Sequence, residues 1–511
     1  MAVRSDRAVI GALTVLAILL RLPNLGRSYW IDEAISVGIS SHRLSQMPAL
    51  LREDGSPPLF YVILHFWILL FGTSPDATHV LPLLLSLAAI PVAYWAAGQV
   101  FDRRAGLGAA ALVATNPFLN WYSTETRMYT LVVLLALAGS AFAWRAVRDR
   151  RPGDAVAAVA VNTALLYTHD WGLYLAGATA LVLLWWTVST GDRALTWWVV
   201  GGGAACLVLW LPWVPSFLYQ AGNTAAPWAV RPGVGDFFAD PATALGGTLG
   251  IIVVPLLAFG AWSVRNRVSE ADRKVAGVIA GFALVATIAG FVGAEMEPSW
   301  TVRYLAVIVG PYLLAAAGML SSSRRGRAVI WATCGIVAVG ALIGSVLPNP
   351  NGRYAKDNMA AVAQAVAPQL ATGDVVVATQ TEQVPVAHFY LPAGLHYLTP
   401  TGPVTNPGIV DWRNIVARLR QAAPCPALGP TLDDMPVGAH VLEIDPVRNL
   451  GASGSAWATA VNSQVRAVDQ FLREDPALKP IGVYQTALDP RPFAPVDGVL
   501  YEKISLSPSC S

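Results

Sequence analysis

Charged residues are scarce in this chain. They make up 13% of its 511 residues, whereas hydrophobic residues make up 55%. A soluble domain has about 25% charged residues, so this composition excludes an ordinary soluble protein. The net charge is +2 and no run of basic residues occurs, which gives no indication of a nucleic-acid partner. The composition therefore predicts a polytopic membrane protein.

Two kinds of motif are also missing from the sequence. No glycine-rich loop of the kind that binds nucleotide phosphates occurs, and this argues against an ATP-driven pump. No set of His, Cys, Asp and Glu residues has the spacing of a strong metal site. The sequence thus indicates no certain cofactor, and a requirement for a divalent cation stays open.

Cysteine is rare as well, with four residues in the chain. Cys206 and Cys334 lie in apolar runs, where we expect them to be plain core residues. Cys425 and Cys510 lie in the more polar C-terminal part. If that part is outside the cytosol, these two cysteines can form one disulfide.

Long apolar runs, in contrast, are abundant. Eleven of them approach the length needed to cross a hydrocarbon core about 30 Å thick. They are 8–25, 79–100, 105–121, 128–147, 154–169, 171–189, 194–218, 243–264, 275–294, 303–320 and 328–347. The first resembles a signal peptide, but no small-residue cleavage site precedes its exit at Arg21, so we expect a retained first helix.

A further apolar run, 57–72, is too short to cross easily. As a helix it would reach only about 22 Å at 1.5 Å per residue. The arginine-rich loops all fall on one side of the membrane if this run does not cross, with the N-terminus cytoplasmic. In the alternative, 57–72 crosses and 105–121 does not, which leaves Arg103 and Arg104 on the wrong side. We therefore expect 57–72 to be a juxtamembrane helix within a first outer loop, 26–78.

The composition of the chain changes near residue 348. Beyond it the apolar runs shorten to strand length, as in 375–378 and 441–444, and helical patterns lie between them. The sequence predicts a transmembrane domain over 1–347 with about eleven helices. It also predicts a soluble, extracytoplasmic α/β domain over 348–511.

Two adjacent carboxylates, Asp32 and Glu33, follow the first span directly after Trp30 and Ile31. Ionised groups at the bilayer are costly and usually functional, and an interfacial tryptophan fixes their depth just outside the hydrocarbon. One carboxylate can act as general base on an acceptor hydroxyl, while its neighbour tunes that base or orients the acceptor. A structural alternative is that both are solvated, or that Asp32 caps a helix over 34–40. We predict that both are catalytic.

Two arginines lie on the predicted outer side, where the positive-inside rule disfavours them. Arg127 follows Glu125 in the loop after the third span, and Arg303 precedes Tyr304 at the start of a late span. Because a guanidinium binds phosphate oxygens bidentately, these arginines predict an anion site in the outer leaflet. Glu125 could orient Arg127 or bind an acceptor. The structural alternative is an arginine that snorkels to the interface, which is the interpretation we favour for Arg21.

Three more polar residues lie on the predicted outer side. Asp54 stands just before the Pro57-Pro58 pair, and it either caps the juxtamembrane helix or faces the same cleft as Asp32. His169 and Asp170 form an outer turn, and such a pair is more often structural than catalytic. We include Asp54, His169 and Asp170 as acceptor-binding or supporting candidates.

These residues, in this order, resemble the GT-C superfamily of integral-membrane glycosyltransferases. The resemblance is to the branch of protein O-mannosyltransferases and the aminoarabinose transferase of lipid A, and it covers roughly 8–320. It rests on the acid pair of the first outer loop, the Pro-Pro juxtamembrane helix, the loop with Glu125 and Arg127, and the late Arg303-Tyr304 pair. Ser56 departs from the related pattern, which often has His before Pro-Pro.

The resemblance implies an inverting transferase that takes a sugar from a polyprenyl-phosphate donor in the cell membrane. Asp32 then matches the base that deprotonates the acceptor, and Glu33 is the second acid of the pair. Arg127, Arg303 and Tyr304 become candidates for binding the donor phosphate. Mannose or arabinose is the expected sugar, since the composition is typical of a high-GC bacterium. The acceptor would be an extracytoplasmic lipid, glycan or protein.

Two other functions fit a polytopic membrane protein. A transporter or flippase of lipid-linked intermediates should carry paired charges near the bilayer midplane, often in two repeated halves. Here the polar groups cluster in the outer loops, and the sequence has no internal repeat. A non-catalytic cell-envelope assembly protein would leave Asp32, Arg127 and Arg303 without a purpose. Both stay as alternatives to a glycosyltransferase.

Overall fold

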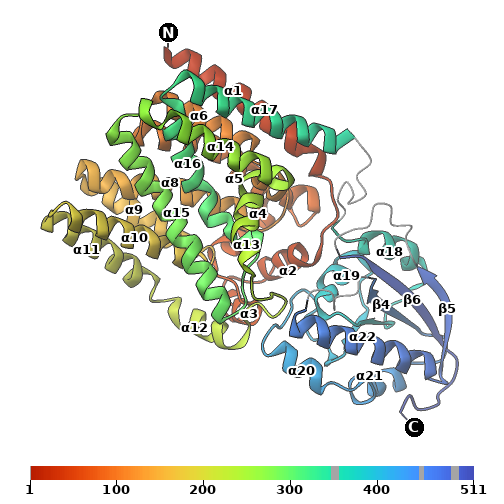
Figure 1. The fold of residues 1–511 in the computed structure, drawn as a ribbon. Coiled ribbons are helices and arrows are strands. Elements are labelled where there is room, and N and C mark those ends of the chain that lie inside the picture. The colour runs from red at the N-terminus through yellow and green to blue at the C-terminus, as the bar shows by residue number, and fades with distance from the viewer. Residues whose placement is uncertain (1, 347–355, 448–453, 485–493, 511) are drawn as a thin grey trace.

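The computed structural model describes residues 2–346, 356–447, 454–484 and 494–510. It consists of a helical part and a C-terminal part that contains a six-stranded sheet (Figure 1). The predicted fold class, a polytopic helical membrane protein with a C-terminal α/β domain, is confirmed. The boundary predicted between residues 347 and 348 lies outside the described residues.

Each of the eleven predicted spans contains helix. Within the described part of the chain, eight segments are long and apolar enough to cross a membrane. They are α5 (Pro75–Val100), α8 (Tyr129–Asp149), α10 (Gly172–Ser189), α11 (Arg193–Trp210), the segment Val234–Arg267 with α13 (Val234–Gly246) and α14 (Gly250–Val264), α15 (Glu270–Met296), the segment Val302–Ser321 with α16 (Ala306–Ser321), and α17 (Arg324–Val346). The remaining three predicted spans correspond to α1 (Ala2–Arg21), α6 (Arg103–Thr115) and α9 (Pro152–Leu166).

The span expected over 105–121 is not one continuous helix. α6 ends at Thr115, because Pro117 has no backbone N–H to continue the hydrogen-bond ladder and instead starts a new helix. The side chain of Asn116 accepts a hydrogen bond from the Leu119 amide at 3.0 Å and so caps α7 (Pro117–Tyr122). The break shortens the span and turns the chain toward the end of the helical part where the next loop, 123–128, begins.

Arg21, at the end of α1, does not snorkel. Its side chain is fully buried, and its guanidinium donates to Asn120 Oδ1 at 3.1 Å and to Ser86 Oγ at 3.3 Å. It also donates to the carbonyl oxygens of Val113 and Ala114. The sequence-based interpretation is therefore wrong for this residue, because buried acceptors at the α6–α7 break satisfy its donors.

Short helices form the first outer loop. They are α2 (Ile31–Ser40), α3 (Met47–Asp54) and α4 (Leu59–Phe71), and α12 (Val214–Asn223) packs on α3 from a later loop. α4 corresponds to the predicted juxtamembrane helix. Its 13 residues are too few to cross a bilayer at 1.5 Å per residue, and Trp67 ties it to the start of α5 by donating to the Ala77 carbonyl at 2.8 Å.

The C-terminal part is a mixed sheet with helices on both faces. The strands are β1 (Val375–Ala378), β2 (His396–Thr399), β3 (Gly402–Pro403), β4 (His440–Pro446), β5 (Leu478–Tyr484) and β6 (Val496–Lys503), in the order β3-β2-β1-β4-β6-β5. β2, β1 and β4 run parallel to one another. β3 pairs antiparallel with β2, β6 pairs antiparallel with β4, and β5 pairs antiparallel with β6. The helices are α18 (Met359–Val366), α19 (Val384–Tyr390), α20 (Ile415–Gln421), α21 (Pro424–Asp433) and α22 (Ala456–Glu474).

Alternating side chains of strand β1 pack into two separate hydrophobic clusters, one on each face of the sheet. Val375 and Val377 of β1 pack in the cluster that includes Val468 of α22, whereas Val376 packs in the cluster that includes Val362 of α18. This is the period-two alternation of a strand that is covered on both faces. The predicted strands 375–378 and 441–444 are confirmed.

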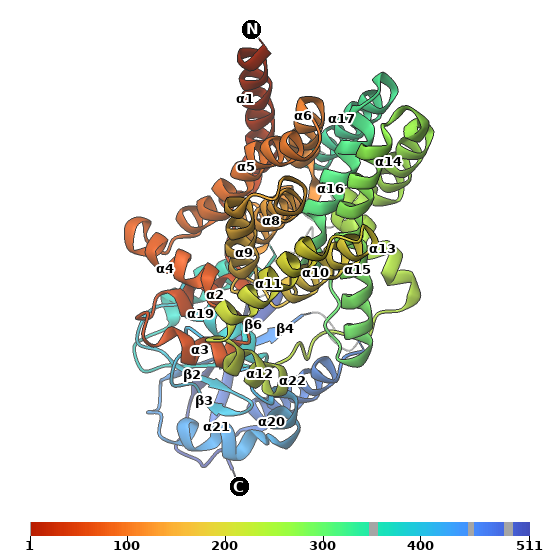
Figure 2. The ribbon, with the colours of Figure 1, turned by 90° about the vertical axis from the view of Figure 1, so that its left-hand side faces the viewer.

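The C-terminal part rests on the first outer loop of the helical part. Gly38 of α2 lies so close to Gly408 that a Cβ atom at position 38 would be 1.7 Å from the Gly408 carbonyl oxygen. The Tyr29 amide donates to the Tyr390 hydroxyl at 2.7 Å, and the Trp412 amide donates to the Glu53 carbonyl at 2.9 Å. Figure 2 shows the C-terminal part at the end of the molecule opposite the N-terminus.

The structure contains the predicted disulfide between Cys425, at the start of α21, and Cys510. We expect both cysteines to be oxidised in the native protein. Alkylation under denaturing conditions without reductant should leave these two thiols unmodified, and reduction should add two alkyl groups in the intact mass. Two alkylatable thiols in the C-terminal part before reduction would contradict the prediction. Removing a native disulfide typically costs about 2–4 kcal/mol.

Candidate active site

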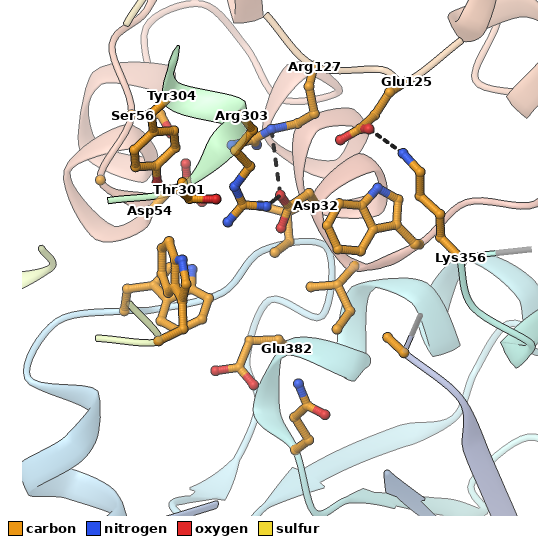
Figure 3. A pocket seen from close by; sticks show the side chains of 18 of the residues that line it. Asp32, Asp54, Ser56, Glu125, Arg127, Thr301, Arg303, Tyr304, Lys356 and Glu382 are labelled. Atoms are coloured by element: carbon orange, nitrogen blue, oxygen red, sulfur yellow. Dashed lines mark hydrogen bonds and ion pairs between the residues drawn. The ribbon is translucent and has the colours of Figure 1, made fainter. Parts of the chain in front are cut away.

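A cavity of about 800 Å³ lies where the helical and C-terminal parts meet. The helical wall comes from the predicted outer loops, with Asp32, Asp54, Ser56, Glu125, Arg127, Thr301, Arg303 and Tyr304. The opposite wall comes from the C-terminal part, with Lys356, Gln380, Glu382, Trp412 and Trp457 (Figure 3). The cavity therefore gathers residues that are far apart in the sequence.

Asp32 lies between two arginines in this cavity. Its Oδ2 atom accepts a hydrogen bond from Arg303 Nη1 at 2.7 Å and is 4.0 Å from Arg127 Nε. Asp32 is in the first turn of α2, where acidic side chains are favoured by the helix dipole. The outer carboxylate and the two outer arginines predicted from the sequence thus form one cluster.

Glu33 points away from the cavity and is buried. Its Oε1 atom accepts from His79 Nε2 and from the Thr126 amide, both at 2.8 Å, and its Oε2 accepts from the Trp30 amide at 3.4 Å. Burial opposes the charged form, but the neighbouring His79 and Lys356 hold the pKa of Glu33 below its usual range. Glu33 thereby joins α2, α5 and the loop that carries Arg127.

The two arginines have unused donors. Arg127 Nη1 donates to Ser36 Oγ and to the Tyr61 hydroxyl, both at 3.1 Å. The Nε atoms of Arg127 and Arg303 are buried and have no hydrogen-bond partner among the described residues. The Arg303 guanidinium lies 5.6 Å from the ring centre of Tyr304, within cation–π distance. Free donors on two neighbouring guanidinium groups suit an anionic ligand.

Glu125 pairs with a lysine of the C-terminal part. Lys356 Nζ donates to Glu125 Oε2, and the same ammonium group lies 5.2 Å from the ring centre of Trp30 and 5.3 Å from that of Trp121. Burial raises the pKa of Glu125 although Lys356 opposes this. The side chains of Glu125 and Arg127 form no hydrogen bond with each other, so the contacts do not support the predicted role of Glu125 in orienting Arg127.

Asp54 lines the cavity beside the arginines. The Tyr61 hydroxyl, which accepts from Arg127, donates to Asp54 Oδ2 at 3.2 Å. Burial raises the pKa of Asp54, and the positive charge of Arg127 opposes the rise. Asp54 therefore faces the same cleft as Asp32, as one of the two sequence-based interpretations proposed.

Comparison with known proteins gives a family match and several structural matches. A family model described as dolichyl-phosphate-mannose-protein mannosyltransferase matches residues 55–215. No curated protein matches the sequence. The crystal structure of ArnT from Cupriavidus metallidurans in the apo state has a TM-score of 0.61 at 15% identity, and the match covers 98% of each chain.

The chain has the GT-C glycosyltransferase fold.

Two further structures with this GT-C fold match over nearly the whole chain. ArnT from Cupriavidus metallidurans bound to undecaprenyl phosphate has a TM-score of 0.59 at 14% identity, with 100% of each chain covered. The arabinofuranosyltransferase AftD from Mycobacteria has a TM-score of 0.52 at 15% identity, with 98% of this chain and 40% of that chain covered. The predicted resemblance to the GT-C superfamily is confirmed.

His169 and Asp170, although in a predicted outer turn, do not line the cavity. The Trp171 amide donates to His169 Nδ1 at 3.1 Å, and the His169 ring packs edge-on against Tyr304 with 4.8 Å between ring centres. Burial lowers the pKa of His169 to about 3, so this residue is a neutral support for Tyr304. Burial raises the pKa of Asp170 to about 7. We therefore place both behind the site.

Several residues of this cavity could not be recognised as site residues from the sequence. Lys356, Glu382, Trp412 and Trp457 lie in the C-terminal part, where no motif distinguishes them. His79 had a detectable signal, because it is an ionisable residue inside an apolar run. Each of these residues was missed because its role depends on contacts with chain segments that are distant in sequence.

Two carboxylates of the cavity pair with cations of the protein itself. Asp32 and Glu125 contact Arg303 and Lys356. Three carboxylates close enough to share a metal ion occur at Glu443, Asp445 and Asp469, in and beside the sheet. None of these three lines the cavity.

Proposed function

We propose that this protein is an inverting glycosyltransferase that moves a sugar from a polyprenyl-phosphate donor to a hydroxyl group of an acceptor. The observation that carries the proposal is the position of Asp32, in the cavity between Arg303 at 2.7 Å and Arg127 at 4.0 Å. The GT-C fold supports the reaction class. The match to ArnT bound to undecaprenyl phosphate supports a polyprenyl phosphate as the lipid of the donor.

In this proposal Asp32 is the general base. It takes the proton of the acceptor hydroxyl as that oxygen attacks the anomeric carbon from the face opposite the phosphate. The new bond joins the acceptor oxygen to the anomeric carbon, and the bond from that carbon to the phosphate oxygen breaks. The leaving polyprenyl phosphate gains negative charge, which the guanidinium groups of Arg127 and Arg303 in the cavity wall stabilise. The configuration at the anomeric carbon inverts.

The proposal also assigns supporting roles. Glu33 and His79 position the start of α2 relative to the loop that carries Arg127, so we assign Glu33 as a positioning residue rather than a second base. Tyr304 and Asp54 border the phosphate-binding arginines. We place the N-terminus in the cytoplasm and the cavity and C-terminal part outside it. The reason is that the arginine-rich loops, which favour the cytoplasm, are predicted on the side of the membrane opposite the loops that line the cavity. Mannose or arabinose is the sugar that we propose.

The test is transfer of radiolabelled sugar by the purified full chain. Polyprenyl-phosphate mannose and polyprenyl-phosphate arabinose are supplied in parallel, with an extract of bacterial membranes as the pool of acceptors. We expect label in the acceptor pool from one donor and release of polyprenyl phosphate in equal amount. No incorporation from either donor, with no binding of undecaprenyl phosphate, would contradict the proposal and favour a non-catalytic assembly protein.

Arg127→Ala and Arg303→Ala should each weaken the binding of undecaprenyl phosphate by about tenfold or more. A hydrogen bond between charged groups contributes about 1.5–3 kcal/mol, and 1.4 kcal/mol corresponds to a factor of ten in Kd. Arg231→Ala is the matched control, because Arg231 is an exposed arginine in a predicted outer loop and does not line the cavity. Unchanged Kd in both cavity variants would rule out the assigned phosphate site.

A further inference from the structure

The cavity has two walls of different chemistry. The helical wall carries charge, with Asp32, Glu125, Arg127 and Arg303. The wall of the C-terminal part, together with Trp228 of the loop after α12, has three tryptophans besides Lys356, which pairs with Glu125. Its tryptophans are Trp228, Trp412 and Trp457, and it includes one carboxylate, Glu382 (Figure 3). The phosphate chemistry described above uses the first wall and leaves the second unexplained.

The three tryptophans lie in series along the cavity. The ring centres of Trp228 and Trp412 are 4.7 Å apart, and those of Trp412 and Trp457 are 6.3 Å apart. The row of tryptophans starts beside the cluster of Asp32 and its two arginines, because the Arg303 guanidinium lies 5.8 Å from the ring centre of Trp228. A molecule bound along this surface would therefore have one end beside Asp32 and Arg303. Flat indole faces suit the C–H face of a sugar ring.

Glu382 adds a polar anchor to this surface. It is buried, and its Oε1 atom accepts from Trp457 Nε1 at 3.0 Å. Its Oε2 atom has no hydrogen-bond partner among the described residues, although the Gln380 side chain is close enough to lower its pKa. Burial is the larger effect and raises the pKa of Glu382 to about 7. Leaving a buried acceptor unpaired is costly, so a ligand hydroxyl that donates to Oε2 would gain binding energy.

The combination of groups discriminates between ligand classes. An acyl chain would cover the tryptophans but leave Glu382 unpaired. An anionic headgroup would be repelled by the Glu382 carboxylate. A sugar ring presents an apolar face to the indoles and hydroxyl donors to Glu382 and Gln380 at its edge. The match is therefore best for a carbohydrate.

We infer that Trp228, Trp412, Trp457 and Glu382 form an acceptor subsite for a glycan, so that the C-terminal part selects the acceptor while the helical part holds the donor. This inference rests on the proposed function, because it places the acceptor hydroxyl beside Asp32. A cavity of about 800 Å³ falls in the range of ligand pockets, about 300–1,000 Å³. The acceptor sugar would lie on the aromatic wall, with its attacking hydroxyl at the Trp228 end.

The experiment uses the transfer assay with the bacterial membrane extract, dosed by its total carbohydrate. After exhaustive protease digestion and organic extraction, we expect the label as the end residue of an oligosaccharide. We also expect Trp412→Ala and Glu382→Gln to raise the half-saturating concentration of the extract tenfold or more. The Kd for undecaprenyl phosphate should stay within twofold of wild type, which also shows that the variants are folded. Trp412→Phe, which keeps an aromatic face, should recover most of the loss.

Matched controls and contradicting outcomes are available. Trp331→Ala replaces an exposed tryptophan of α17, and Glu474→Gln replaces an exposed carboxylate of α22; neither should change the half-saturating concentration. Label on peptides or on lipid without a glycan would overturn the inference, as would wild-type half-saturation in Trp412→Ala and Glu382→Gln. In both cases transfer persists and the proposed function stands. Absence of both transfer and undecaprenyl phosphate binding in wild type would instead overturn the proposed function and the inference with it.

Discussion

Replacing Asp32 with asparagine should lower the kcat of sugar transfer by about 10²–10⁴, the range typical of a lost general base. Asparagine has nearly the same size, but its amide does not take a proton from the acceptor hydroxyl. Asp32 also holds Arg303 at 2.7 Å, so the substitution frees that guanidinium. The Kd for undecaprenyl phosphate should therefore be equal to or lower than that of wild type, because the phosphate no longer competes with a carboxylate. Initial rates of radiolabel transfer and a separate lipid-binding assay measure the two effects.

The separation of rate from binding makes this prediction specific. A residue with a purely structural role would weaken donor binding and transfer together, whereas the base affects transfer alone. Glu297→Gln is the matched control, because Glu297 is an exposed carboxylate in the predicted outer loop that precedes Arg303, outside the cavity. It should transfer sugar at the wild-type rate. Wild-type turnover by Asp32→Asn would remove Asp32 from the mechanism.

Much of the site could be predicted because charge is expensive at a membrane. Asp32, Arg127 and Arg303 were found from their positions beside apolar runs, on the side of the membrane where arginine is disfavoured. The structure places all three within one cavity. The eleven helical runs and the strands of the C-terminal part were predictable for a related reason, since hydrophobic length and period depend on local sequence.

Other features depend on contacts that local sequence does not contain. Asp32 and Glu33 are neighbours, yet residues one apart on a helix point about 100° apart, so one faces the cavity and the other the interior. Nothing near Lys356 indicates that it pairs with Glu125, more than 200 residues earlier. The aromatic wall likewise forms only when Trp228 and Trp412 meet across the two parts of the molecule. Partners set by tertiary packing therefore had to come from the structure.

Replacing Glu33 with alanine should destabilise the protein by about 3–5 kcal/mol, the cost of breaking a buried ion pair by removing one partner. His79 faces an acceptor at each ring nitrogen, with the Leu25 carbonyl at 2.7 Å from Nδ1 and Glu33 Oε1 at 2.8 Å from Nε2. The variant leaves His79 and the Thr126 amide without their buried acceptor. The melting temperature in detergent should fall by several degrees, and transfer should fall with it as the loop bearing Arg127 loses its anchor.

The double variant Glu33→Leu/His79→Leu is the informative control. Replacing both members of a buried pair with apolar side chains costs less than removing one, so part of the lost stability should return. A Glu33→Ala protein with the wild-type melting temperature but no transfer would contradict the positioning role. It would restore the catalytic role that the acid pair suggests.

The pH dependence of stability gives a second test of Glu33. Burial opposes its ionisation, but His79 and Lys356 hold its folded-state pKa below the unfolded value of about 4.3. Its stabilising contribution is therefore complete above pH 4.3 and is lost as the pH falls through the lower folded-state value. The difference in melting temperature between wild type and Glu33→Ala should be full at neutral pH and should shrink below about pH 4. A difference that stays constant across this range would mean that the charge of Glu33 does not stabilise the joint between α2, α5 and the Arg127 loop.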